Sequence, residues 1–292
     1  KLELYGFISS HTKVYTIDRM CFLLDVNRSS YYRYLDKQVK KGLSEKERQV
    51  VDVFKEHKRR YGSRRISKEL DNKGVKVGRG RVRKIMAREG LVAIQPKSFV
   101  PRTTMANPLH RRSENLLLDR VFPSCPNSVW VGDITYLPLE SGDWLYLAVW
   151  MDLYSRYIVG WEVDDNMRAG LVIKPFRKAV KARKPEKGLI VHSDGGGQYS
   201  DKEFRQLLES LTFKQSMTRK DNHYDNAFAE SLFSRFKSEL LEGGTFIDLE
   251  DAKTECFEYI EEYYNRKRLH SSLDYQIPEE FEKIYHLGRG EQ

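Results

Sequence analysis

Three acidic residues occupy positions from which they could share metal ions. Asp133 lies within a β-branched, apolar segment, Asp194 follows the short apolar run 189–192 and precedes three glycines, and Glu230 lies in a long helical segment. Carboxylates at close quarters repel one another unless divalent cations neutralise them. Their hard oxygen atoms select Mg²⁺ or Mn²⁺. Two such ions, about 4 Å apart, support in-line phosphoryl displacement in polymerases and nucleases, so the trio predicts this chemistry if the fold brings its members together.

Lys237 is predicted to belong to the same site. It lies seven residues after Glu230, and Asn226 lies four residues before Glu230, so a helix over about 225–241 carries all three on one face. We interpret Lys237 as a contact for a substrate phosphate, and Asn222 and Asn226 as contacts for a DNA strand. The alternatives are a plain surface Glu and Lys pair, and helix capping by Asp225 or Asn222.

The elements that must position these residues predict an α/β fold. Three segments rich in β-branched and aromatic residues, separated by polar turns, predict an antiparallel meander. They span 129–137, 144–153 and 157–163, and are followed by a helix over 169–184, a strand over 189–192, a helix over 200–211, a strand near 212–217 and the long helix. This order predicts a ribonuclease-H-like core with a mixed five-stranded sheet and flanking helices. Asp194 then lies at the carboxyl end of a strand, where open α/β sheets place their sites.

Charge is divided unevenly along the chain. Residues 1–112 carry 28 Lys and Arg against 11 Asp and Glu, whereas residues 113–292 carry 23 against 31. Clustered Lys and Arg gain free energy by releasing counterions from phosphates. The first part is therefore predicted to bind a polyanion, and the carboxylates of the second part need another purpose.

The basic part is predicted to be all-α and to contain a helix-turn-helix. Ser44 and Glu47 match a capping box, and the turn at 72–74 separates two short helices, of which the second covers about 79–88 and the first has Ser63 as its expected N-cap. A solvated cationic face is the alternative interpretation. The predicted DNA contacts of this region are Arg59, Arg60, Arg64, Arg65, Arg79, Arg81, Arg83 and Lys84.

Composition shifts predict five regions. They are an N-terminal helical segment (1–42), the helix-turn-helix domain (43–94), a proline-rich extended linker (95–127), the core (128–241) and a C-terminal helical element (242–292). In the last region the basic run Arg266 to Arg268 is interpreted either as a phosphate contact or as a solvated turn.

Several other residues receive structural rather than chemical interpretations. Asp143 and Asp152 are expected to stabilise turns, His192 to hydrogen-bond internally, and the four tryptophans to lie in the core. The three cysteines lack disulfide or zinc spacing and are expected to be buried thiols. No run of eighteen apolar residues and no signal segment is present, which predicts a soluble, intracellular protein.

Four motifs together resemble the catalytic core of the retroviral-integrase superfamily, and more closely the OrfB-type transposases of the insertion-sequence-three family. They are VWVGDITY at 129–136, DLYSR at 152–156, HSDGGGQY at 192–199 and DNAFAES at 225–231. The 35 residues between Asp194 and Glu230 match the spacing of that family's Asp, Asp, Glu triad, and Lys237 matches its basic residue. Segments 60–91 and 264–278 also resemble the family's helix-turn-helix and C-terminal elements. Gly195 and Asp221 depart from its pattern.

The resemblance implies a DDE transposase in which Asp133, Asp194 and Glu230 hold two Mg²⁺ or Mn²⁺ ions. Such an enzyme cuts at the element's terminal inverted repeats and uses a DNA 3′-hydroxyl for strand transfer, through a figure-eight and then a circle that integrates into target DNA. It also implies a homo-oligomer on DNA, at least a dimer, and an upstream OrfA partner or fusion, because this sequence has no heptad seam.

Two other functions are consistent with parts of the sequence. One is a catalytically silent DNA-binding regulator that keeps only the shell of the core, which the intact triad disfavours. The other is a ribonuclease-H-like nuclease, for which the basic N-terminal region and linker would be superfluous.

Overall fold

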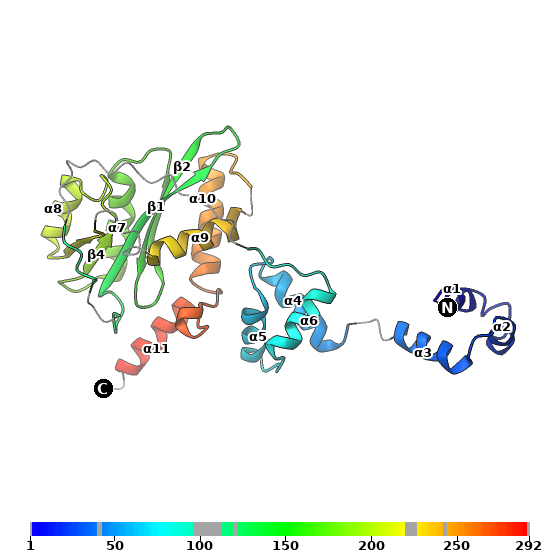
Figure 1. Ribbon diagram of the computed structural model, residues 1–292. Coiled ribbons are helices and arrows are strands. Elements are labelled where there is room, and N and C mark those ends of the chain that lie inside the picture. The colour runs from blue at the N-terminus through cyan, green and yellow to red at the C-terminus, as the bar shows by residue number, and fades with distance from the viewer. Residues whose placement is uncertain are drawn as a thin grey trace. The chain divides into compact units, whose positions relative to one another are not determined.

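The computed structural model describes residues 2–39, 43–95, 113–118, 122–219, 227–241 and 244–290 (Figure 1). The chain divides into two compact units, 1–92 and 93–292. None of the helices in the described part of the chain is both long and apolar enough to cross a lipid bilayer.

The first unit is entirely helical. Its first three helices enclose a small cluster of Ile8, Met20, Cys21 and Tyr31. The N-cap Thr16 accepts a hydrogen bond from the backbone N–H of Arg19 at the start of the second helix. The six helices of the unit are α1 (Leu2–Ser10), α2 (Ile17–Leu23), α3 (Arg28–Val39), α4 (Glu45–Glu56), α5 (Ser63–Asn72) and α6 (Arg79–Arg88).

Helices α4 to α6 have the predicted helix-turn-helix order. The expected capping box is present, because the N–H of Ser44 donates to the Glu47 carboxylate at 2.9 Å. The expected N-cap at Ser63 is wrong by one residue, since Gly62 holds the extended N-cap conformation and Ser63 begins α5. Gly74 has φ +79°, which allows the chain to turn between α5 and α6. The core between the three helices consists of Val50, Val53, Phe54, Ile66, Leu70, Val82 and Ile85.

The second unit contains the predicted mixed five-stranded sheet. Its strand order is β3-β2-β1-β4-β5, in which β1, β2 and β3 are antiparallel and β1, β4 and β5 are parallel. The strands are β1 (Val129–Pro138), β2 (Trp144–Asp152), β3 (Ile158–Asp164), β4 (Ile190–Ser193) and β5 (Lys214–Met217).

Helices contact both ends of the strand order. Helix α7 contacts β2 and β3, α8 contacts β5, α9 contacts β1 and α10 contacts β3 (Figure 1). The helices of this unit are α7 (Gly170–Arg183), α8 (Lys202–Ser210), α9 (Ala227–Leu241), α10 (Leu249–Phe257), the π-helix η2 (Glu258–Tyr264), the 3₁₀-helix η3 (Ser271–Leu273) and α11 (Pro278–Gly290).

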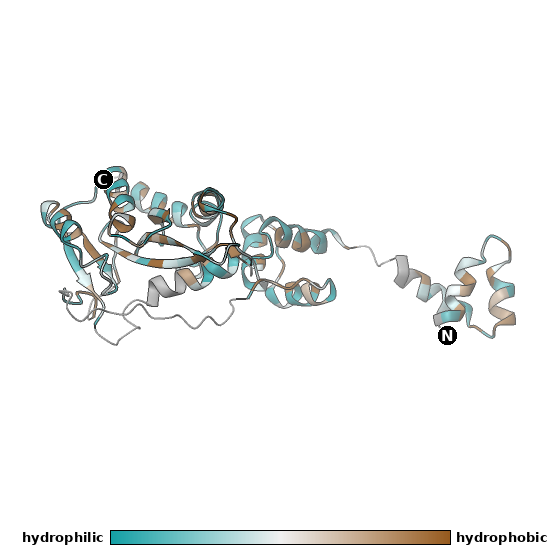
Figure 2. Ribbon diagram, turned by 90° about the horizontal axis from the view of Figure 1, so that it is seen from above, coloured by the Kyte–Doolittle hydropathy of each residue, from teal (hydrophilic) through white to brown (hydrophobic). Residues whose placement is uncertain are grey.

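The main core lies between one face of the sheet and helices α7 and α8. Trp150 is fully buried there, donates from its indole nitrogen to the Val172 carbonyl at 3.0 Å, and leaves no space for a Cβ atom at the facing Gly132. Hydrophobic residues run along the strands, whereas the helices alternate hydrophobic and hydrophilic residues (Figure 2). The expectation that all four tryptophans are core is wrong for Trp144, which is 47% exposed because it stands at the first position of β2, beside the turn. Trp161 is only half-buried, and its indole nitrogen donates to Glu261 at 2.9 Å.

Candidate functional site

Asp133 lies in β1, and Asp194 lies one residue after the end of the neighbouring parallel strand β4. The register pairs Val131 of β1 with His192 of β4, and each carboxylate lies two residues further along its chain. Side chains two residues apart in a strand share a face, and adjacent strands are about 5 Å apart. The structure therefore brings these two predicted site residues together at the carboxyl edge of the parallel strands. Both side chains are half-buried.

Backbone amides hold both carboxylates. Asp133 Oδ1 accepts a hydrogen bond from the N–H of Ile134 at 2.9 Å, and Asp194 Oδ1 accepts one from the N–H of Gly196 at 3.0 Å. A Cβ atom on Gly196 would lie 2.9 Å from that same Asp194 oxygen. Because Gly196 has no Cβ atom, its backbone can approach the Asp194 carboxylate closely.

Helix α9 brings Lys237 to this site. Lys237 is half-buried, and burial lowers the pKa of its ammonium group, while the negative charge of Asp133 opposes that shift. The two charges therefore act on each other across the α9–β1 contact. The backbone of Glu230 lies in the same helix, two turns before Lys237 and on the same helical face. The side chain of Glu230 is outside the described part of the structure.

Tyr199 is a member of this site that sequence reasoning missed. Its ring packs in the core against Trp150 and Phe204, and its hydroxyl is buried with no hydrogen-bond partner among the described residues. Burial raises the pKa of Tyr199 well above its ordinary value, and the charges of Asp133 and Asp194 raise it further. Its only signal in the sequence was its place at the end of the motif HSDGGGQY, five residues after Asp194.

Among the described side chains, no group of three His, Cys, Asp or Glu forms a ready metal cluster. The described groups of the candidate site are the carboxylates of Asp133 and Asp194, the ammonium of Lys237 and the hydroxyl of Tyr199. Glu230 belongs to helix α9, which also carries Lys237. The predicted contacts Asn222 and Asn226, and the departure Asp221, lie outside the described residues.

The segment 113–118, from the predicted linker, lies against the edge strand β5. The N–H of Leu116 donates to Ser216 Oγ at 2.9 Å, and the N–H of Met217 donates to the Glu114 carbonyl at 3.3 Å. Ser216 also hydrogen-bonds His192 Nδ1 at 2.8 Å, which confirms the expected internal role of His192. This part of the predicted extended linker is therefore attached to the sheet.

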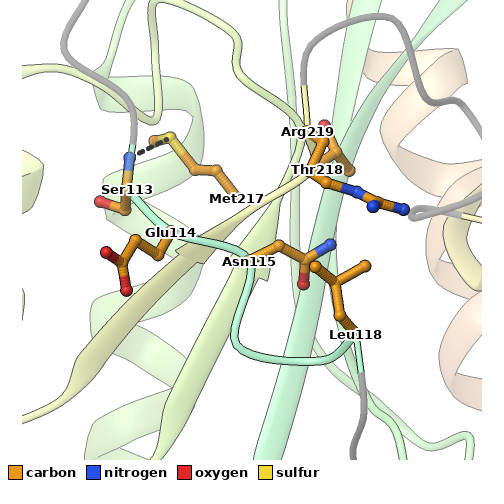
Figure 3. Close-up of a pocket in the computed structure, with 7 residues that line it drawn as sticks. All are labelled: Ser113, Glu114, Asn115, Leu118, Met217, Thr218 and Arg219. Carbon is orange, nitrogen blue, oxygen red and sulfur yellow. Dashed lines mark hydrogen bonds between the residues drawn. The ribbon is translucent and has the colours of Figure 1, made fainter.

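A pocket of about 490 Å³ opens between this segment and the end of β5 (Figure 3). Thr218 on its wall donates its N–H to the Ser193 carbonyl at 3.0 Å, one residue before Asp194. The pocket thus lies on the same edge of the sheet as the carboxylates. Its lining consists of Ser113, Glu114, Asn115, Leu118, Met217, Thr218 and Arg219.

The predicted DNA contacts of the first unit lie on and beside α5 and α6. Four of them are exposed on one short helix, α6, namely Arg79, Arg81, Arg83 and Lys84. Of the earlier four, Arg59 and Arg64 are exposed and Arg60 and Arg65 are half-buried. The guanidinium of Arg65 lies 5.6 Å from the centre of the Tyr61 ring. Arg88 differs from the others, because it pairs with Glu47 at 3.1 Å and Glu89 at 2.7 Å.

Asp152 ends β2, where it pairs with Trp130, three residues before Asp133 in β1. It is fully buried and accepts hydrogen bonds from the backbone N–H groups of Asn127, Tyr154 and Ser155, which confirms its expected role in a turn. The interpretation of Arg268 as a phosphate contact or solvated turn is wrong. Arg268 is 2% exposed and forms two hydrogen bonds to Glu239, of 2.8 and 2.7 Å.

Family models match most of the chain. Residues 43–99 match an HTH-like domain, and residues 123–223 and 211–278 match two models of the integrase core domain.

Relatives of this chain are named as transposases. It is 42% identical over 242 residues to the transposase for insertion sequence element IS904 of Lactococcus lactis subsp. lactis, covering 82% of this chain and 93% of the relative. It is 38% identical over 283 residues to transposase InsF for insertion sequence IS3A of Escherichia coli K12, covering 95% and 98%. Among solved structures, the HTLV-2 integrase catalytic core domain in complex with magnesium aligns with 55% of this chain and 98% of its own length, at 17% identity and a TM-score of 0.41.

Proposed function

Since this chain belongs to the transposases of the IS3 family, we propose that it cuts and joins DNA strands with Asp133, Asp194 and Glu230 as the ligands of two Mg²⁺ or Mn²⁺ ions. The observation that carries the proposal is the placement of Asp133 in β1 and of Asp194 directly after the neighbouring parallel strand β4. Helix α9 contacts β1 and supplies Lys237, with Glu230 on the same helical face.

The donor set fits a hard divalent cation. Two half-buried carboxylates at one sheet edge supply anionic oxygen, which Mg²⁺ and Mn²⁺ prefer. The buried hydroxyl of Tyr199 has no hydrogen-bond partner among the described residues, although the charges of both carboxylates reach it. A hydrated ion between the carboxylates would give that hydroxyl an acceptor. When bound, the ions neutralise the carboxylates and stabilise the charge that develops on the reacting phosphate.

The protein residues then hold the substrate for an in-line displacement. A DNA 3′-hydroxyl oxygen attacks the phosphorus, a new phosphoester bond forms, and the bond to the leaving oxygen breaks. Lys237 holds a non-bridging oxygen of that phosphate through its ammonium group. The half-buried position of Lys237 favours this, because a phosphate is a stronger partner for a desolvated ammonium than water alone. By resemblance to the family, the first joining is within one strand and yields a figure-eight and then a circle.

DNA is bound chiefly through the first unit. Four basic residues give α6 a cationic exposed surface, namely Arg79, Arg81, Arg83 and Lys84. Helix α6 is the second helix of the helix-turn-helix, the element that enters the major groove in such motifs. The substrates are the terminal inverted repeats of the element and the target DNA. Two ends must be held at once, so we propose at least a dimer on DNA, with an upstream OrfA protein as partner or fusion, at the nucleoid in the bacterial cytoplasm.

The test is cleavage and joining of a labelled duplex that carries the element's terminal repeats. We expect product with Mg²⁺ or Mn²⁺, none with a chelator, and none from Asp194→Asn, which keeps the side-chain volume but removes the charge. The matched control is Glu186→Gln, an exposed carboxylate before β4, which should cleave normally. Magnesium-dependent product that persists in Asp194→Asn would remove Asp194 from the mechanism. DNA binding without any cleavage would indicate the silent regulator instead, and cleavage of only an RNA–DNA hybrid would indicate the nuclease.

A further inference from the structure

We infer that the buried ion pair between Glu239 and Arg268 positions helix α9, so that the C-terminal element controls the geometry of the metal-binding site. This inference rests on the proposed function, because it assigns a positioning role toward the carboxylates named there. It concerns Glu239, Tyr259, Asn265 and Arg268, which are neither the proposed metal ligands nor the predicted DNA contacts of the first unit.

The ion pair is buried and has several partners. Arg268 donates through Nε and Nη2 to both carboxylate oxygens of Glu239, at 2.8 and 2.7 Å. The hydroxyl of Tyr259 donates to the same carboxylate at 2.9 Å. Glu239 is 6% exposed and Arg268 2%. Such an arrangement fixes direction as well as distance, because a guanidinium and a carboxylate that share two hydrogen bonds are held in one plane.

Charge supports the same geometry. Burial lowers the pKa of Arg268, but the charge and hydrogen bonds of Glu239 outweigh this and leave the pKa well above its ordinary value. Burial and the negative charge of Glu239 raise the pKa of Tyr259, which keeps its hydroxyl protonated as a donor. Both groups thus keep the protons that they donate to Glu239 at neutral pH.

The ion pair sets the rotation of α9 about its own axis. At 100° per residue, position 239 lies roughly 180° around the helix from position 230 and roughly 160° from position 237. One side of α9 therefore carries Glu230 and Lys237, and the other carries Glu239. Phe236 adds to the second side, because its ring packs 4.9 Å from the ring of Tyr259. The hydrogen bonds to Glu239 therefore direct the opposite side of α9 toward β1, the strand that contains Asp133.

The segment that carries Arg268 is attached to the sheet through Asn265. Asn265 is fully buried and uses its amide as both donor and acceptor to the backbone of Ile158 in β3, at 3.1 and 2.9 Å. It follows the π-helix η2, which includes Tyr259, and precedes Arg268 by three residues. The route from sheet to Asn265 to Arg268 to Glu239 therefore fixes α9 relative to the strands that carry Asp133 and Asp194.

The same unit offers a matched control. Arg183 of α7 forms two hydrogen bonds to Glu282 of α11, at 2.7 and 2.6 Å, and both side chains are largely buried. This pair also joins the C-terminal element to the core, but neither residue belongs to α9. Loss of either pair should destabilise the unit, so only an effect specific to the Glu239 pair is evidence of positioning.

The experiment compares Glu239→Gln and Arg268→Lys with Glu282→Gln in the full-length chain. The first readout is the Mg²⁺ concentration that gives half of the metal-induced rise in Tm, without DNA. The second is hydrogen exchange of the α9 amides with no metal present. Tyr259→Phe, which removes one hydrogen bond to Glu239 and leaves the packing intact, serves if Glu239→Gln does not fold.

We expect about a tenfold or larger increase in the required Mg²⁺ for Glu239→Gln, a smaller one for Tyr259→Phe, faster exchange in α9, and wild-type Mg²⁺ dependence for Glu282→Gln. Equal Mg²⁺ dependence in all variants would overturn the positioning role, as would an equal loss in Glu282→Gln. Failure of the proposed function is a separate outcome, because there the wild type would show no Mg²⁺-induced rise in Tm or Asp194→Asn would retain it.

Discussion

Asp133 and Asp194 lie near each other because the parallel pairing of β1 and β4 places Val131 opposite His192, with Asp133 two residues further along β1 and Asp194 just past the end of β4. The two negative charges repel each other, and both side chains are half-buried, so both effects destabilise the metal-free fold. We therefore expect Asp194→Asn to raise the free energy of unfolding in a chelator by on the order of 1 kcal/mol, and to abolish the stabilisation by Mg²⁺. Urea unfolding with and without Mg²⁺ checks both effects. A variant less stable than wild type in the chelator would contradict the repulsion.

Tyr199→Phe should separate metal binding from folding. The hydroxyl is buried without a hydrogen-bond partner in the described structure, so its removal should leave the metal-free stability equal or increase it by about 1 kcal/mol. If the hydroxyl interacts with a hydrated ion, the same variant should need several-fold more Mg²⁺ for half-maximal stabilisation. Isothermal titration with Mg²⁺ measures this affinity. Unchanged affinity would show that the hydroxyl has no part in the metal site.

The helix-turn-helix unit should lose stability in acid through His57. The side chain of His57 is 4% exposed and stacks on Tyr61 with ring centres 3.7 Å apart, and burial lowers the pKa of His57 to about 4. The unfolded chain binds the proton more tightly, so the contribution is fully present above pH 6.5 and is lost as the pH falls through about 4. We expect a loss on the order of 2–3 kcal/mol.

Hydrogen exchange of the α4 to α6 amides at pH 7 and pH 4, corrected for intrinsic rates, measures that loss. His57→Phe should keep the stacking and remove most of the pH dependence. Tryptophan fluorescence is unsuitable here, because all four tryptophans lie in β1, β2 and β3.

Asp152 should give the second unit the opposite pH dependence. Burial, with a smaller contribution from Glu282, raises the pKa of Asp152 to about 6, against the backbone hydrogen bond from Asn127 and the charge of Arg183. The folded chain then binds the proton more tightly, so the contribution to stability is fully present below pH 3.8 and is lost as the pH rises through about 6. The difference is on the order of 2–3 kcal/mol. About half of this difference falls between pH 5 and pH 7.5, because pH 5 is only about one unit below the folded pKa. Urea unfolding followed by tryptophan fluorescence at these two pH values should show that change, and Asp152→Asn should flatten it.

The basic residues on the exposed surface of α6 should contribute to the salt dependence of DNA binding. Each of Arg81→Ala and Arg83→Ala should reduce the slope of log affinity against log salt by about 1, if each guanidinium contacts a phosphate. Arg88→Ala is the matched control on the same helix, because Arg88 is occupied by Glu47 and Glu89. A slope that changes equally in all three variants would indicate a general charge effect instead of specific contacts.

Local sequence patterns predicted most of the fold. The alternating and β-branched segments, the glycine after Asp194 and the helical spacing of Glu230 and Lys237 are short-range signals, and they placed the strands, the long helix and the carboxylate pair. The sheet order followed from the order of strands and helices along the chain. The boundary error at Ser63 and the exposure of Trp144 arose where one residue at the end of an element decides the outcome.

The parts that the sequence did not predict depend on distant pairs. Glu239 and Arg268 are 29 residues apart, and each is a common surface type that only the tertiary structure makes buried. The hydroxyl of Tyr199 and the contact of Leu116 with Ser216 are similar cases, because burial and long-range hydrogen bonds leave no periodic trace in the sequence.

The attachment of residues 113–118 to β5 has a consequence for handling the protein. β5 is the last strand of the sheet, and an uncovered last strand offers its backbone groups to any other chain that can pair with it. The Glu114 carbonyl accepts from one of those backbone groups, the N–H of Met217, and the N–H of Leu116 donates to the Ser216 side chain beside it. The segment thus shields the protein from self-association through its sheet. A fragment beginning at residue 122 would keep all five strands and the carboxylates yet become prone to forming fibrils or aggregates, whereas one beginning at residue 113 would keep its protection.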